Sequence, residues 1–101
     1  MDDVLNGRRF ADAVAFGTSC LDAPKLPKRK TNPYQVPLRS LLVKGLRNVL
    51  VGGRCFSGDR AALASTRVMC TGCLMGQAAG YAAAFAVRDQ HALRKSDPAA
   101  I

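Results

Sequence analysis

One uncharged stretch, Val68 to Val87, is bracketed by Arg67 and Arg88 and constrains the fold more than any other feature. Ala, Leu, Met and Gln dominate it and no proline interrupts it, which predicts an α-helix from about Thr71 to Asp89. Thr71 is the expected N-cap. A helix that is apolar all round belongs in a core, so we expect this one to be buried against a sheet.

Small residues recur at every fourth position of this expected helix, at Gly72, Gly76, Gly80 and Ala84. Four-residue spacing places them on one helical face. Each interior glycine costs about 1 kcal/mol relative to alanine, which implies a packing or ligand reason for keeping three of them. We therefore expect this face to approach another backbone or a ligand closely.

The same stretch has the length of a membrane span, and its glycine spacing is like that of paired transmembrane helices. Against this interpretation, Thr71, Gln77 and the abundant alanines would make insertion only weakly favourable. We prefer a helix in a water-soluble protein, and keep a small membrane-associated protein as an alternative.

Upstream segments indicate short strands and tight turns. Tyr34 to Leu38 is expected to be a strand with Pro37 at its edge or end, because proline cannot donate to a ladder. Asn48 to Val51 is a continuous apolar run that predicts a fully buried strand. Gly52 and Gly53 follow it, as expected where the backbone turns sharply or admits a ligand. Strands followed by a long helix place the chain in the α/β class.

The remaining segments are less regular. A short helical turn is expected to begin with a cap at Asp2 or Asp3 and to end at Asn6. Asp22 to Pro33 contains three prolines and four cations, which favours an extended surface connection. Ser57 to Leu63 is expected to be a loop or a short helix.

The formal charge is +8, from 15 Lys and Arg against 7 Asp and Glu, which makes polyanion binding a second alternative. The densest cations are Lys25, Lys28, Arg29 and Lys30, and no aromatic side chains lie among them to stack on bases. A solvated loop, without nucleic-acid binding, is the preferred interpretation. The acidic N-terminus lacks the features of a secretory signal, so a cytoplasmic protein is expected.

Four cysteines, Cys20, Cys55, Cys70 and Cys73, are expected to be free thiols in that compartment. Cys70 and Cys73 form a Cys-x-x-Cys motif, but no second pair stands at a spacing suited to zinc or an iron–sulfur cluster. Buried packing thiols are the preferred interpretation, ahead of a metal ligand pair or a redox dithiol.

Four segments, read in order, carry a resemblance: 34–41 (YQVPLRSL), 48–54 (NVLVGGR), 67–71 (RVMCT) and 75–80 (MGQAAG). Their order and spacing resemble the FAD-dependent oxidoreductase family, in particular proteins like the flavin subunit of heterodisulfide reductase. The resemblance implies the C-terminal fragment of an FAD/NAD(P)-binding fold. We divide it into a connecting segment (1–33), a flavin-site block (34–89) and a truncated tail (90–101).

The resemblance also implies the residues that bind FAD. The Gly52-Gly53 turn would let main-chain amides approach the cofactor, and Arg54 would pair with a phosphate or cap the loop. The helix start would face the flavin ring, either through amides around residues 76–78 or, if the helix begins at Thr71, through residues 72–75. The candidate cofactor-binding residues are Gly53, Arg54, Arg67, Thr71, Met75, Gly76, Gln77 and Ala78.

What the sequence lacks is also informative. No Gly-x-Gly-x-x-Gly motif for the ADP half of FAD occurs in the 101 residues, so we expect a fragment that is inactive alone. Its parent would be an FAD-dependent oxidoreductase with an unknown small-molecule substrate, completed by an N-terminal nucleotide-binding segment. Any iron–sulfur cluster, as some relatives carry, would be held there too. Many relatives have a His-Glu pair where this chain has Arg60-Ala61, so no catalytic residue is assigned.

Overall fold

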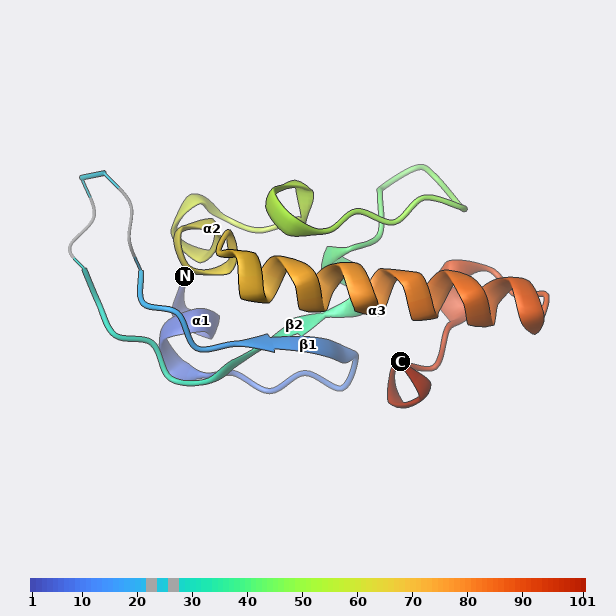
Figure 1. The fold of residues 1–101 in the computed structure, drawn as a ribbon, viewed down its shortest axis with the longest axis horizontal. Coiled ribbons are helices and arrows are strands. Elements are labelled where there is room, and N and C mark those ends of the chain that lie inside the picture. The colour runs from blue at the N-terminus through green and yellow to red at the C-terminus, as the bar shows by residue number, and fades with distance from the viewer. Residues whose placement is uncertain (22–23, 26–27) are drawn as a thin grey trace.

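The computed structural model describes residues 1–21, 24–25 and 28–101, and part of the expected 22–33 connection lies outside them. The fold is mixed α/β, which confirms the predicted class, and it is elongated, with extents of 45 × 22 × 20 Å (Figure 1). Four short 3₁₀ turns accompany the main elements. In chain order the helices and strands are α1 (Asp2–Asn6), β1 (Ala13–Gly17), β2 (Tyr34–Pro37), α2 (Arg60–Thr66) and α3 (Met69–Arg88).

The sheet consists of β1 and β2, paired antiparallel with Gly17 opposite Tyr34. β2 confirms the predicted strand, and Pro37 is its last residue. α3 packs on β1 (Figure 1), and the core cluster includes Tyr34 and Val36 of β2 and Met75 of α3. A two-stranded sheet is marginal in water by itself, so this helix is what makes it stable.

The junction between β2, α2 and α3 is closely packed. The buried Tyr34 hydroxyl and Ser65 Oγ lie 2.9 Å apart in a hydrogen bond. A Cβ added at Gly17 would stand 2.5 Å from that hydroxyl and 3.0 Å from Thr71 Oγ1. Only glycine therefore fits at the end of β1 without displacing buried atoms.

The predicted long helix is confirmed, but two details of it were wrong. α3 begins at Met69 after Val68, so Thr71 is not the N-cap and lies buried in the first turn. The helix is also not buried all round, because one stripe faces the core and the other side faces solvent. The buried stripe consists of Thr71, Met75, Ala78, Ala82 and Ala86.

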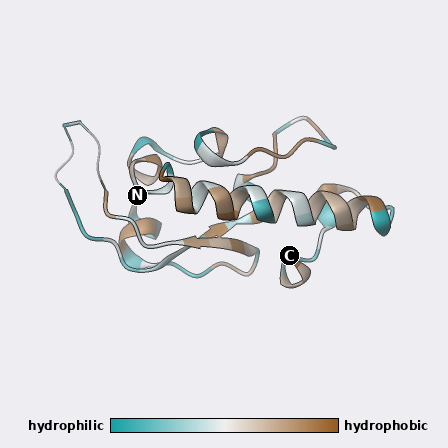
Figure 2. Cartoon of the chain, in the orientation of Figure 1, coloured by the Kyte–Doolittle hydropathy of each residue, from teal (hydrophilic) through white to brown (hydrophobic). Residues whose placement is uncertain are grey.

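The solvent-facing side of α3 is apolar too. Figure 2 shows apolar and neutral colours along most of the helix, and Met69, Tyr81 and Val87 are large exposed side chains on it. Among the described residues, this helix alone has the length and apolar composition of a membrane span, although a soluble core helix passes the same test.

The predicted strand at 48–51 is wrong. Leu50 forms an isolated bridge with Leu42, Val51 N–H donates to the Leu41 carbonyl at 2.8 Å, and Val49 is exposed. A fully buried strand needs paired neighbours and cover on both faces. The sheet of the described residues ends at β1 and β2, so this run stays outside it: Leu50 is half-buried against the core and Val49 is exposed.

The predictions for the two short helices are mostly confirmed. α1 ends at Asn6 as expected, with Gly7 in the left-handed conformation, although Met1 rather than an aspartate is its N-cap. A helix does occur in the 57–63 region, where α2 begins at Arg60. Asp59 caps it by accepting a hydrogen bond from Ala62 N–H at 2.7 Å.

Candidate functional site at the start of α3

A hollow of about 530 Å³ lies at the N-terminal end of α3. Two predicted site residues, Arg54 and Arg67, both line it, although α2 separates them in the sequence. Its other lining residues are small or apolar: Ser19, Cys20, Ala64, Val68 and Met69. The hollow therefore combines two guanidinium groups with the positive end of a twenty-residue helix.

The turn between α2 and α3 positions Arg67. α2 ends at Thr66, whose buried hydroxyl donates to the Ala62 carbonyl at 3.0 Å and fixes the last turn. Arg67 keeps a helical conformation, and its N–H donates to the Leu63 carbonyl. Val68 is extended (ψ 151°), which turns the chain into α3. The guanidinium of Arg67 is thus set directly before the start of α3.

The glycine turn positions Arg54. Gly53 has φ +61°, a left-handed conformation that glycine adopts at little cost, and it opens the 3₁₀ turn Gly53–Cys55. This turn packs on the beginning of α3, where a Cβ added at Gly72 would lie 3.8 Å from the Gly53 Cα. The expected tight turn is confirmed, and it places Arg54 beside the helix end.

The glycine stripe itself differs from the prediction. Gly72 meets the glycine turn, but a Cβ added at Gly76 or Gly80 would find no atom within 4 Å among the described residues. The expected close approach to another backbone is therefore confirmed only in part: a Cβ added at Gly52 would lie 3.6 Å from the Gly76 nitrogen, but within the described residues no backbone covers the open side of Gly76 and Gly80. Three of its four positions, Gly76, Gly80 and Ala84, are exposed.

The free amides at the helix start are not those that were expected. Because α3 begins at Met69 and Gly72 N–H donates to the Val68 carbonyl at 2.9 Å, the amides before Gly72 are the ones without an intrahelical acceptor. They belong to Met69, Cys70 and Thr71. The amides of residues 72–75 and 76–78 lie inside the helix. Both predicted sets of free amides were therefore placed too far toward the C-terminus of α3.

The predicted site residues on α3 lie on two different faces of the helix. The side chains of Thr71, Met75 and Ala78 are buried on the core side of α3. Gly76 and Gln77 are exposed on the other side. Of the eight predicted residues, only Arg54 and Arg67 line the hollow. Gly53 directly precedes Arg54 in the glycine turn, and Thr71 lies in the first turn of α3.

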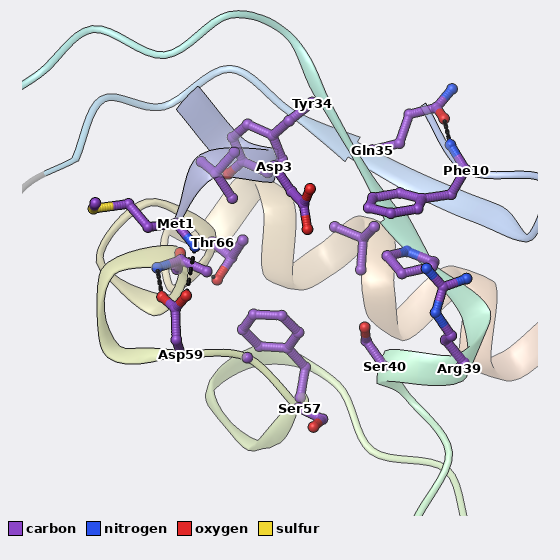
Figure 3. Close-up of a pocket in the computed structure, with 16 residues that line it drawn as sticks. Met1, Asp3, Phe10, Tyr34, Gln35, Arg39, Ser40, Ser57, Asp59 and Thr66 are labelled. Atoms are coloured by element: carbon purple, nitrogen blue, oxygen red, sulfur yellow. Dashed lines mark hydrogen bonds and ion pairs between the residues drawn. The ribbon is translucent and has the colours of Figure 1, made fainter. Parts of the chain in front are cut away.

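A second cavity, of about 240 Å³, lies among α1, β2 and the loop before α2 (Figure 3). Sequence reasoning missed it, because its walls come from four separate segments and contain no motif. Several of its polar groups are already paired: Gln35 Oε1 accepts from Phe10 N–H at 2.8 Å, and Arg39 pairs with Asp12. The amino group of Met1 and the Ala62 amide hold the Asp59 pKa below its usual value. The lining of this cavity includes Asp3 and Asp59, whereas the hollow at α3 is lined by two arginines and no carboxylate.

The cysteines contradict the expectation of buried packing thiols. All four are free, as predicted, but all four are exposed. Within the residues that the structure describes, no three or more His, Cys, Asp or Glu side chains come together to hold a metal ion. The Cys-x-x-Cys pair occupies the first two turns of α3, next to the hollow.

Comparison with known proteins gives one match. Neither a curated protein nor a solved structure was matched. The family model described as "FAD dependent oxidoreductase" matches residues 1–101, and so covers the glycine turn, both arginines and α3. On that evidence, the chain belongs to the FAD-dependent oxidoreductase family.

Proposed function

We propose that the hollow at the start of α3 forms part of an FAD site in an oxidoreductase. The observation that carries the proposal is the convergence of Arg54 and Arg67 on one hollow at a helix N-terminus. Guanidinium groups form strong charge-assisted hydrogen bonds with phosphates, and a helix end favours any anion placed before it.

The residues present fit such a cofactor. The donor set is cationic, whereas the diphosphate of FAD is anionic. Gly53 leaves open space where a side chain would stand, since an added Cβ there has no atom within 4 Å. Backbone amides of the glycine turn are thus accessible to a ligand without steric obstruction.

FAD, when bound, supplies the electron-accepting ring of the reaction. The chain's own residues would bind and orient it: Arg54 and Arg67, which line the hollow, would hold negative charge, and the free amides of Met69 to Thr71 lie in the adjacent first turn of α3. Because the diphosphate carries the same charge in oxidised and reduced FAD, cations bound to it would contribute to affinity in both states.

We further propose that residues outside this sequence complete the site. A dinucleotide is usually enclosed on several sides, whereas the hollow is formed by one helix end and two turns. The ADP half of the cofactor would be bound by a separate nucleotide-binding segment in a parent enzyme, acting in the cytoplasm on a small molecule. A protein like the flavin subunit of heterodisulfide reductase fits this organisation.

Calorimetric titration of the chain with FAD tests the proposal. An incomplete site should bind with a Kd of about 1 mM, near −4 kcal/mol. Arg54→Gln removes one charge-assisted contact and should weaken binding about tenfold or more, whereas Arg47→Gln, an exposed arginine away from the hollow, should leave it unchanged. Submicromolar binding of FAD would contradict the proposal that this chain carries only part of the site. Equal FAD affinity of the two variants would show that the hollow does not bind FAD.

A further inference from the structure

The two thiols of the Cys-x-x-Cys motif lie at the surface at the start of α3. Both Cys70 and Cys73 are exposed, so neither sulfur fills the core. The described residues bring no third ligand close enough to make a metal site with them. A pair of exposed thiols retained at this position points to the chemistry of the thiols themselves.

The helix brings the two thiols together. Cys70 is the second residue of α3 and Cys73 lies three residues later, so their side chains are neighbours on the helix surface. Cβ atoms at this spacing are about 5–6 Å apart, whereas a disulfide needs about 3.5–4.5 Å. The first turn must tighten to close the bond. Cys70 can shift toward Cys73 without breaking a hydrogen bond of its own amide, because the amides before Gly72 have no intrahelical acceptor.

A bond closed under such strain is easily reduced again. Strained or exposed disulfides are the labile and catalytic ones, in contrast to structural disulfides, which resist reduction. The two thiols are exposed, lie close together on the helix and stand at its N-terminal end, as a reversible dithiol requires.

We propose that Cys70 and Cys73 form a redox-active dithiol that reduces disulfides of low-molecular-weight thiols. Cys70, in the first turn, is the attacking thiol, and Cys73, one turn further along, is the resolving thiol. The proposal stands on these two residues and does not depend on the flavin site.

The reaction is ordinary thiol–disulfide exchange. Cys70 Sγ, as a thiolate, attacks one sulfur of a disulfide RSSR, forms a Cys70–SR bond and releases RS⁻, which takes up a proton. Cys73 Sγ then loses its proton, attacks Cys70 Sγ and releases the second RS⁻, which is protonated in turn. The products are two RSH and a Cys70–Cys73 disulfide, so two electrons and two protons have passed to the substrate. A dithiol from solution reduces the pair by the reverse exchange.

The test exposes the full 101-residue chain to oxidised glutathione without FAD, followed by acid quenching, alkylation and mass spectrometry of the peptides. In the wild-type chain we expect loss of two hydrogen atoms from the peptide that contains Cys70 and Cys73, reversed by dithiothreitol. Cys73→Ser should accumulate glutathione on Cys70, because the mixed disulfide is no longer resolved. Cys70→Ser should abolish the intramolecular disulfide.

The chain offers a matched control in its other exposed thiols. The double variant Cys20→Ser with Cys55→Ser should retain the full cycle, and circular dichroism of each variant checks that α3 is intact. The proposal is overturned if glutathione accumulates equally on all four cysteines, or if the intramolecular bond forms between any other pair. It is also overturned if folded Cys73→Ser takes up no glutathione at Cys70.

Discussion

The two faces of α3 differ in what they contact, although both are apolar. On the core face, Met75 and Ala82 are fully buried, and Thr71 packs against the end of β1. On the other face, Gly76 and Gly80 have open space where a Cβ would stand, and Val87 is 79% exposed. Composition alone cannot distinguish these faces. What distinguishes them is whether another part of the described chain lies close enough to cover them.

The buried residues and the exposed glycines of α3 therefore differ in what they contribute to stability. The buried residues of the core face supply apolar area that stabilises the fold. The glycines of the open face lower helix stability by about 1 kcal/mol each without any packing gain within the described residues. The open face therefore reflects something other than the stability of this chain, and substitutions on the two faces should have opposite consequences.

The largest effect is expected from removing a core-face side chain. Met75→Ala leaves a cavity beside Tyr34 and Val36 and should lower the free energy of unfolding by about 2–5 kcal/mol. Val87→Ala, on the exposed face, should change it by no more than about 0.5 kcal/mol. Urea unfolding followed by circular dichroism measures both. Equal losses in the two variants would show that the exposed face is covered in solution.

A matched pair of glycine substitutions sharpens the comparison. Gly17→Ala places a methyl group 2.5 Å from the Tyr34 hydroxyl, so overpacking should cost about 1–3 kcal/mol. Gly76→Ala meets no atom within 4 Å and should stabilise the helix by about 1 kcal/mol. Thermal unfolding of the two variants shows whether each substitution lowers or raises the stability of the fold. A destabilising Gly76→Ala would mean that the stripe is closely packed after all.

Fractionation of the expressed chain tests the membrane alternative. α3 buries one face on β1 and carries glycines and Gln77 on the other, so insertion into lipid should be weakly favourable at best. We expect the chain in the soluble fraction, with any membrane-associated material released by alkaline carbonate. Recovery only in alkali-resistant membranes would favour a transmembrane α3.

The sequence predicted the elements whose signals are local. The α3 helix, the β2 strand ending at Pro37 and the turn at Gly52 and Gly53 follow from residue propensities over a few positions. The 48–51 strand was wrong because the same apolar run becomes a strand only where neighbours pair with it. Burial of the Cys-x-x-Cys thiols was wrong for a related reason, since cysteine composition does not reveal which helix face meets the sheet.

The candidate site was predictable only in part. Motif order identified Arg54 and Arg67, and the structure brings both to one hollow. The start of α3 was misplaced by two residues because Thr71 looks like a cap, whereas its hydroxyl is buried near Tyr34. A shift of two residues changes which amides are free, so the sequence could not decide which of them face a ligand.

The most direct test of the account is to locate where FAD contacts the chain. Backbone amide NMR of the isotope-labelled chain, titrated with FAD, reports each contact separately and tolerates a Kd of about 1 mM. Arg54→Gln and Arg47→Gln serve as the variant and its charge-matched control.

The account predicts that the largest shifts occur at the glycine turn and the first turn of α3, that Arg54→Gln removes them, and that Arg47→Gln keeps them. The residues expected to respond are Gly53, Arg54, Met69, Cys70 and Thr71. Shifts concentrated instead in the cavity near α1, at Phe10, Gln35 and Ser57, or shifts unchanged by Arg54→Gln, would contradict the placement of the flavin site at the start of α3.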